Sequence, residues 1–290
     1  MTKNNYVGTS MKRRKILKLS SGSLIALPAC SSKKGEKGEK VGKHGASSSR
    51  YGNQPVRLGA NTQYRPPAYV NKGLRNPNMN LPTQFSGKSV THSRGLSNQP
   101  YVAMTFDDGP HPQNTPRLLD ILRTRNIKAT FYVIGSNVDR YPHIVRRIVA
   151  EGHEIGNHTY THRKLTTLSN SELRREMRRT EDAIVRAAAV KPRTMRPPYG
   201  ALFERQRSLI FSDFTYPTIM WSVDPNDWKR PGPSVVRSRI LRGAHNGAII
   251  LAHDLHAPTI DAMPGTFDDL LSKGYQFITV SQLLALKGQA

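Results

Sequence analysis

Cysteine, acidic residues and long apolar runs are all scarce in this chain of 290 residues. The single cysteine, Cys30, excludes a disulfide within the chain, so any folded part must be held by its core. No apolar stretch approaches the roughly 20 residues of a membrane-spanning helix, which excludes a membrane bundle. The chain has 20 acidic against 44 basic residues and a net charge of +24. This balance favours anionic partners.

The first 30 residues are predicted to be an export signal. Basic residues at 12–15 precede a modest apolar stretch, 16–29, which is too short and too polar to span a bilayer. The basic run resembles a twin-arginine signal, and a Sec signal is the alternative. The segment closes on Leu27-Pro28-Ala29-Cys30, which resembles a bacterial lipobox. We expect lipidation at Cys30 and a membrane-anchored protein that faces the periplasm or the cell exterior; if Cys30 is incidental, the protein is secreted.

Most of the positive charge precedes the region of regular apolar patterning. Residues 1–100 carry 18 basic and 2 acidic residues, so they supply 16 of the 24 net charges. Residues 31–98 are rich in Gly, Ser, Asn, Gln, Pro and Lys, and such a composition buries too little apolar surface to offset chain entropy. We therefore predict a disordered basic linker. No nucleic-acid partner is expected, because stacking aromatics are few and an export signal precedes the linker.

The composition changes from residue 99 onward, and residues 99–290 are predicted to form the folded domain. Runs that are apolar on both faces predict buried parallel strands at 101–106, 129–134, 216–223 and 247–252. Helical patterns lie between and after them, at 116–125, 142–151, 171–189, 233–243 and 267–273. Repeated strand–helix units predict an α/β fold, either a barrel or a doubly wound sheet.

Ionisable residues gather where these strands end. The carboxyl ends of parallel strands are where α/β folds build their active sites. One catalytic constellation is therefore predicted from residues that are distant in the sequence: Asp107 and Asp108, His158 and His162, Arg196, Asp224 and Asp227, and His253.

Two of these groups together have the composition of a metal site. His158 and His162 are four residues apart, so a helical turn would place both imidazoles on one side, within reach of one ion. Asp107 or Asp108 would supply a third ligand and leave a position open, as a catalytic metal requires. Adjacent aspartates on an extended backbone point in opposite directions, so we expect one on the metal and the other on the attacking water.

The remaining residues allow both functional and structural interpretations. Arg196 precedes a rigid Pro-Pro pair and could hold a carboxylate, or it could be an ordinary surface arginine. His253 could be a proton donor whose tautomer is held by Asp224 or Asp227, or a buried core histidine. Trp228 could pack inside the domain or line a sugar platform.

Five segments of the domain resemble, in order, the five motifs of the polysaccharide deacetylase family (NodB-homology domain, carbohydrate esterase 4). The similarity covers about residues 99–287. The segments are Thr105-Phe106-Asp107-Asp108-Gly109-Pro110, His158-Thr159-Tyr160-Thr161-His162, Arg196-Pro197-Pro198-Tyr199-Gly200, Asp224-Pro225-Asn226-Asp227-Trp228 and Leu251-Ala252-His253.

The resemblance implies a distorted (β/α) TIM-like barrel that removes N-acetyl groups from a polymeric amino sugar with one divalent metal, usually Zn²⁺, with Co²⁺ or another divalent ion as an alternative. It implies that the metal ligands are Asp108, His158 and His162. Peptidoglycan and poly-N-acetylglucosamine are the substrates it favours. The alternatives are an O-acetyl esterase on a xylan-type polysaccharide and a non-catalytic glycan-binding lipoprotein. We expect a monomer.

The same resemblance implies a role for each remaining residue of the motifs. Asp107 would be the general base, oriented by Arg196, and His253 would protonate the leaving amine. Asp224 or Asp227 would tune His253. The backbone N–H of Tyr199 would stabilise the oxyanion, and the side chains of Tyr199, Trp228 and Leu251 would line the substrate pocket.

Overall fold

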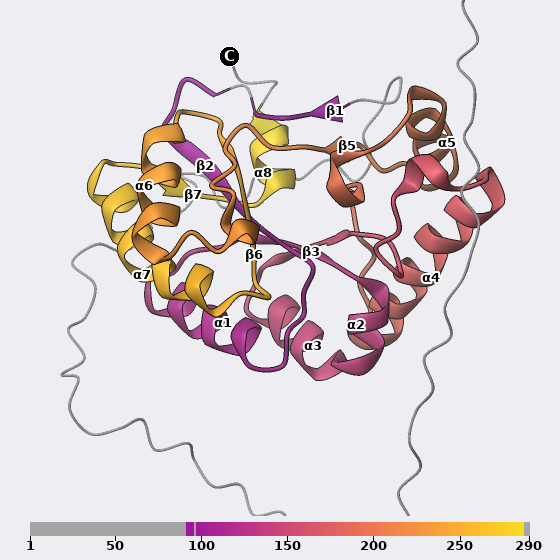
Figure 1. Ribbon diagram of the computed structural model, residues 1–290, viewed down its shortest axis with the longest axis horizontal. Helices are drawn as coiled ribbons and strands as arrows, with labels where there is room; N and C mark the ends of the chain where they lie inside the picture. Colours follow the sequence, from indigo (N-terminus) through magenta and orange to yellow (C-terminus); the bar gives the residue numbers. More distant parts are fainter. Residues whose placement is uncertain (1–90, 96, 287–290) are drawn as a thin grey trace, which may run out of the picture. The chain divides into compact units, whose positions relative to one another are not determined.

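The computed structural model describes residues 91–95 and 97–286 (Figure 1). The predicted signal, Cys30 and most of the predicted linker lie outside these residues. The strands are β1 Thr91–His92, β2 Tyr101–Asp107, β3 Thr130–Val133, β4 Glu154–Asn157, β5 Thr218–Ile219, β6 Ile249–His253 and β7 Gln276–Phe277. The α-helices are α1 Asn114–Thr124, α2 Gly135–Arg140, α3 Pro142–Ala150, α4 Asn170–Ala188, α5 Glu204–Phe214, α6 Pro233–Gly243, α7 Ala257–Ser272 and α8 Val280–Ala285.

Parallel strands form the centre of the fold. The sheet order is β4-β3-β2-β6, β7 also pairs with β2, and β1 pairs with β5. Isolated parallel bridges link the edges of this sheet through β5. Met195 bridges both Asn157 and Thr218, and Val223 bridges Ile250. The strands therefore run from β4 around to β6 as a distorted α/β barrel, which confirms the predicted fold class.

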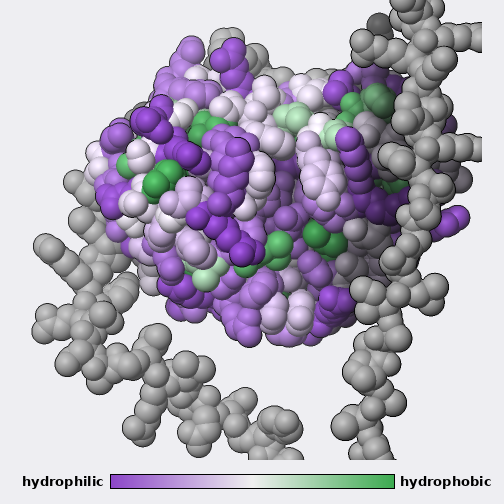
Figure 2. Space-filling view, viewed as in Figure 1, coloured by the Kyte–Doolittle hydropathy of each residue, from purple (hydrophilic) through white to green (hydrophobic). Residues whose placement is uncertain are grey.

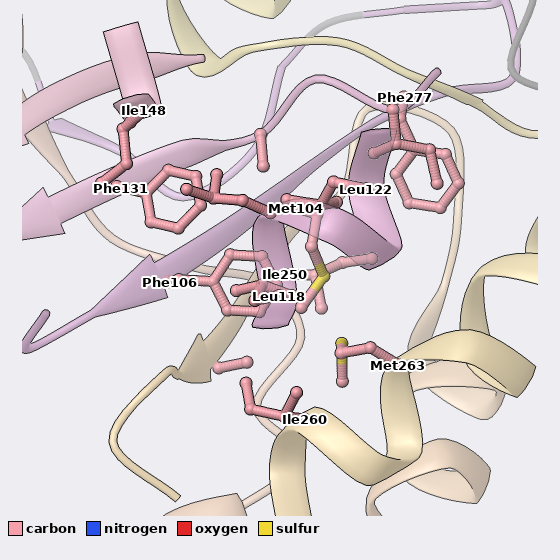
Figure 3. Close-up of a cluster of buried hydrophobic side chains, with 14 of the residues drawn as sticks. Met104, Phe106, Leu118, Leu122, Phe131, Ile148, Ile250, Ile260, Met263 and Phe277 are labelled. Carbon is pink, nitrogen blue, oxygen red and sulfur yellow. The ribbon is translucent and has the colours of Figure 1, made fainter. Parts of the chain in front are cut away.

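Strand β2 contributes side chains to two separate apolar clusters, one on each face of the sheet. All seven of its residues are buried, and successive side chains point to opposite faces. Val102, Met104 and Phe106 face the larger apolar cluster, whereas Tyr101 and Ala103 face a second one. Figure 3 shows side chains of β2, β3, α1 and α7 meeting in the larger cluster. The seventh residue of the strand, Asp107, shares the face of Tyr101 and Ala103, inside the barrel.

Helices cover the outside of the strands (Figure 1), and their ends follow local chemistry. Ser169 caps α4 by accepting from Glu172 N–H, and the Glu172 side chain accepts from Ser169 N–H. The helix α7 begins ten residues before the predicted 267 and runs through Pro264. The rest of the chain supports this helix, because Ile260 and Met263 are fully buried in the core.

The described residues include a short strand within the segment that composition predicts to be a linker. Thr91 and His92 pair with Thr218 and Ile219, and Gly95 N–H donates to Gly247 O at 2.8 Å. A strand of two residues has no apolar pattern to reveal it. No helix among the described residues is long and apolar enough to cross a bilayer. Figure 2 shows hydrophilic side chains over most of one face, with small and separate apolar patches.

Candidate active site

The predicted base and acid lie on neighbouring strands. Asp107 is the last residue of β2 and His253 the last of β6, and the parallel register pairs their Cα positions. Adjacent strands lie about 4.8 Å apart, so the two side chains share the space at the carboxyl end of the sheet. Asp107 is buried and His253 is partly exposed. One group is thus shielded within the barrel while the other faces its mouth.

A fully buried guanidinium fixes Asp107. Arg196 Nη1 donates to Asp107 Oδ1 at 2.7 Å and to Thr105 Oγ1 at 2.7 Å. Its Nε and Nη2 atoms donate to the backbone carbonyls of Ile219 at 3.2 Å and Met220 at 3.0 Å. All three nitrogens of the guanidinium therefore donate hydrogen bonds. The guanidinium binds Oδ1 of Asp107 and not Oδ2. The arginine is a buried partner of a carboxylate and not a surface residue.

Asp108 turns in a different direction from Asp107. Its backbone has φ 75°, which is uncommon for a residue other than glycine, and its carbonyl accepts from Asn137 Nδ2 at 2.9 Å. This conformation aims Asp108 Oδ1 at two imidazoles, 3.3 Å from His158 Nε2 and 3.2 Å from His162 Nε2. The two aspartates therefore have different surroundings, and their division into metal ligand and base stays a prediction.

The two histidines meet, but not on a helix as predicted. They lie in the loop that follows β4, and their ring centroids are 5.0 Å apart. The helical spacing is wrong because Thr159 and His162 both adopt positive φ, 66° and 57°, which turns the chain back on itself instead of continuing in a right-handed turn. A tight loop thus achieves the convergence that a helical turn was expected to give.

Three ligand atoms from Asp108, His158 and His162 lie within 4.8 Å of one another, and their hydrogen bonds fit a cation between them. His158 Nδ1 lies 2.7 Å from Arg196 O, and because a carbonyl only accepts, Nδ1 carries the proton. The neutral imidazole therefore presents the lone pair of Nε2 to Asp108 Oδ1, which is buried and has no hydrogen-bond partner. Two acceptors that face each other are the arrangement a metal ion satisfies, and two imidazoles with one carboxylate suit Zn²⁺.

The pKa shifts show that this pocket favours positive charge. Burial opposes ionisation of Asp108, but the nearby imidazoles of His158 and His162 outweigh it and hold its pKa at about 2. Burial also opposes protonation of His158, yet the nearby carboxylates of Asp107 and Asp108 raise its pKa. The pKa of His162 is lowered by burial and by the charge of His158. The site therefore stabilises a cation near His158 but disfavours two protonated imidazoles.

The structure distinguishes between the two aspartates proposed for His253. Asp227 Oδ1 lies 2.8 Å from His253 Nδ1, and its Oδ2 accepts from His253 N–H at 2.8 Å and from Thr259 Oγ1 at 2.9 Å. Asp224 Oδ1 instead accepts from Asn226 N–H at 2.7 Å, which closes a turn. Burial lowers the pKa of His253, but the hydrogen bond and charge of Asp227 outweigh it and raise the pKa to about 9. His253 is therefore a cation at neutral pH.

Two of the three predicted substrate-binding side chains are exposed. Tyr199 is 69% exposed and Trp228 is 52% exposed, whereas Leu251 is 3% exposed. The Tyr199 ring lies 4.8 Å from the ring of His162. Its backbone has φ 61°, and its N–H donates to no atom among the described residues. Exposure of Trp228 excludes its packing inside the domain.

Sequence reasoning missed polar groups that support these side chains. Thr105 accepts from Arg196, and Thr259 donates to Asp227. Asp254 is completely buried next to His253, where burial raises its pKa to about 7. Its Oδ2 accepts from Thr115 Oγ1, which ties the loop after β6 to the start of α1. Of these residues, only Thr105 could have been found from the sequence, because it lies on the same face of the predicted strand as Asp107.

The strand ends of this distorted α/β barrel bring together a carboxylate–imidazole cluster, a clamped aspartate and a cationic histidine, which are groups that metal-assisted hydrolysis can use. The family model described as "Polysaccharide deacetylase" matches residues 94–216. A peptidoglycan-N-acetylglucosamine deacetylase of Listeria monocytogenes is 40% identical over 188 residues, which are 65% of this chain and 40% of the relative. The chain thus spans two fifths of that relative's length.

Solved structures extend the similarity to the fold. A structure of the T48 deacetylase with substrate is 43% identical, with a TM-score of 0.62, and the match covers 64% of this chain and 92% of that one. A pseudoenzyme of carbohydrate esterase family 4 from Bacillus anthracis is 35% identical, with a TM-score of 0.64, over 68% of this chain and 69% of that one. The chain belongs to the polysaccharide deacetylase family.

Proposed function

We propose that the protein is a metal-dependent hydrolase that removes N-acetyl groups from an amino-sugar polymer of the cell envelope. The observation that carries this proposal is the pairing of Asp107 and His253 on adjacent strands beside the cluster of Asp108, His158 and His162. Amide hydrolysis needs a group that takes a proton from water and another that gives a proton to the amine. Asp107 and His253, which end neighbouring strands in register, are the groups we propose for these two tasks.

Asp108, His158 and His162 would hold one divalent ion, with Zn²⁺ as the first candidate and Co²⁺ as another. Such an ion lowers the pKa of water from about 15.7 to about 7 and polarises a carbonyl oxygen. The chain's own contribution is to arrange the ligands. Arg196 O fixes the His158 tautomer, and the backbone of Asp108 aims its carboxylate at both imidazoles.

Asp107 would act as the general base. Its Oδ1 is held by Arg196, so its Oδ2 remains to accept the proton of a water that attacks the acetamide carbon. The hydrogen bond from a buried guanidinium prevents the carboxylate from rotating. The Tyr199 N–H would donate to the developing oxyanion, a role that favours a backbone donor with no partner of its own.

His253 would act as the general acid. Its Nδ1 proton is held by Asp227, so Nε2 is the atom that delivers a proton to the leaving nitrogen. The raised pKa, about 9, keeps this proton in place at neutral pH. Leu251 would line the pocket for the acetyl methyl, and the exposed rings of Tyr199 and Trp228 would contact the sugar.

Peptidoglycan is the favoured polymer, because the Listeria relative is a peptidoglycan-N-acetylglucosamine deacetylase. The excess of basic residues supports an anionic substrate as well. The predicted lipid anchor at Cys30 would keep the enzyme close to this polymer. Replacing Cys30 with alanine should release the protein from membranes, and unchanged membrane partition would contradict the anchor without affecting the enzymatic proposal.

The deciding experiment measures acetate release by the full chain, loaded with Zn²⁺ or treated with a chelator, from peptidoglycan, chitooligosaccharide and acetylated xylan. Metal-dependent release from an amino-sugar polymer is the expected result. Release from xylan alone would indicate an O-acetyl esterase, and no release despite bound metal would indicate a glycan-binding protein.

The variant Asp107→Asn tests the assignment of the base. It should lower turnover by about 10²- to 10⁴-fold, the usual contribution of a general base, and should retain one metal ion per chain. Metal content is measured by elemental analysis of the same preparation. Loss of the metal together with activity would show that the roles of Asp107 and Asp108 are reversed.

A further inference from the structure

The loop that joins the two metal-binding histidines is held in an unfavourable backbone conformation. Thr159 has φ 66°, a left-handed conformation that is an outlier for a β-branched residue, and His162 has φ 57°. Such conformations are energetically costly and persist only when the surrounding structure determines them. Contacts from outside the loop must therefore hold it.

Those contacts satisfy the backbone of the loop on both sides. The carbonyls of Thr159 and Tyr160 accept from Gly135 N–H and Ser136 N–H, both at 3.0 Å. On the other side, a single carboxylate on α4 accepts the N–H groups of two of the three residues between the histidines. Glu176 Oε2 accepts from Tyr160 N–H at 2.9 Å and from Thr161 N–H at 2.7 Å.

The second oxygen of Glu176 binds the same segment. Thr161 Oγ1 donates to Glu176 Oε1 at 2.8 Å, so all three hydrogen bonds of this carboxylate end on residues 160 and 161. The Glu176 residue is 7% exposed, on a helix whose other charged side chains are largely exposed. Burial of a carboxylate is costly unless its hydrogen bonds are satisfied, and here every bond is spent on the metal-binding loop.

We propose that Glu176 is a positioning residue that presets the loop for metal binding. This inference rests on the proposed function, because it assumes that His158 and His162 are ligands. Glu176 forms no hydrogen bond or ion pair with either imidazole. Its effect passes through Tyr160 and Thr161, whose backbone N–H groups it ties to α4 so that the flanking histidines face Asp108.

The substitutions Glu176→Gln and Glu176→Ala separate hydrogen bonding from charge and from simple packing. A glutamine can place its carbonyl oxygen where Oε2 lies and accept both N–H groups, and its amide can donate to the Thr161 hydroxyl. The glutamine variant should therefore bind Zn²⁺ about as well as the parent. The alanine variant removes all three bonds and should weaken Zn²⁺ binding by about 10- to 100-fold, as loss of an outer partner usually does.

Zn²⁺ binding is measured by calorimetric titration of the full chain. Two variants on the same helix serve as controls: Asp182→Ala removes an exposed acid, and Ile184→Ala destabilises the core without touching the loop. Both should retain the parent affinity when folded. Should Glu176→Ala fail to fold, Thr161→Val removes one of the three bonds alone, and it should weaken binding by a smaller factor.

Hydrogen exchange tests the preset loop without any metal. In the metal-free chain, the amides of Tyr160 and Thr161 should exchange faster in Glu176→Ala than in the parent, and near the parent rate in Glu176→Gln. Unchanged exchange and unchanged Zn²⁺ affinity in the alanine variant would overturn the inference, as would equal losses in both variants. If the parent binds no Zn²⁺, the proposed function fails, and exchange still decides whether Glu176 holds the loop.

Discussion

The two ends of the barrel use the left-handed backbone conformation differently. At the carboxyl end, Asp108, His162 and Tyr199 have positive φ inside loops, and each carries a group of the candidate site. At the amino end, Ala189 and Thr215 have positive φ, but they are the C-caps of α4 and α5, where a helix commonly ends in this way. An unusual dihedral at a helix end is ordinary termination, whereas one in a loop between ionisable side chains points to function.

The size of a cavity does not indicate which end of the barrel holds the candidate site. The amino end holds a cavity of about 840 Å³, whose lining includes His153, Lys191 and Tyr216. Lys191 there lies 3.4 Å from Glu181, which also accepts from Tyr216 Oη, and the buried Nε2 of His153 is a single atom without a hydrogen-bond partner. At the carboxyl end, a buried oxygen of Asp108 lacks a partner beside two imidazoles. Unsatisfied, convergent ligands identify the site better than volume does.

The largest expected effect comes from removing a ligand at the carboxyl end. His162→Ala deletes one of the three ligand groups and leaves Asp108 with one imidazole neighbour. We expect no stoichiometric Zn²⁺ and no acetate release above background, because a two-ligand site holds the ion weakly. Metal content and acetate release are measured on the same preparation. Full activity in this variant would remove His162 from the site.

A smaller effect is expected from the partner of the acid. Asp227→Asn removes the negative charge that raises the pKa of His253 to about 9, so this pKa should fall toward or below the ordinary value of about 6.5. The acid must be protonated to act, and activity is therefore lost as the pH rises through its pKa. The alkaline limb of the kcat/KM profile should move to lower pH, with at least about a tenfold loss at pH 8.

The matched control for this profile is Asp224→Asn, which changes a carboxylate that caps a turn and does not contact His253. Its alkaline limb should coincide with that of the parent. An unmoved limb in Asp227→Asn would show that another group limits activity at high pH.

Much of the barrel could be predicted because its strands are apolar on both faces. The run at 101–106 predicts β2, and the predicted helix 171–189 matches α4 within one residue at each end. The strand β4 was predicted only as the strand end that precedes His158, because Glu154 and Asn157 interrupt its apolar pattern. Ser281 Oγ donates to Glu154, and Asn157 Nδ2 donates to Met177 O. Helix α5 was missed for a related reason, since only Gln206 and Ile210 are buried in it.

The site was predictable in its members but not in its geometry. Residue types at strand ends indicated a carboxylate–histidine cluster, and the structure brings Asp108, His158 and His162 together. The choice between Asp224 and Asp227, however, depends on a contact with a residue 26 positions away from Asp227. The support from Glu176 depends on the packing of α4 against the loop. Local sequence contains no signal for contacts of this kind, because only the closed fold creates them.

The smallest effect is expected at the amino end of the barrel. Tyr216→Phe removes the hydrogen bond to Glu181 but keeps the ring, whose centroid is 5.7 Å from that of Phe214. Glu181 retains its ion pair with Lys191, so the free energy of unfolding should fall by only about 1 kcal/mol. Denaturant unfolding measures this loss, while Zn²⁺ affinity and acetate release should stay at the parent values. Lower turnover in the folded variant would mean that the amino end influences the site across the sheet, and the contrast between the two ends would then be one of degree.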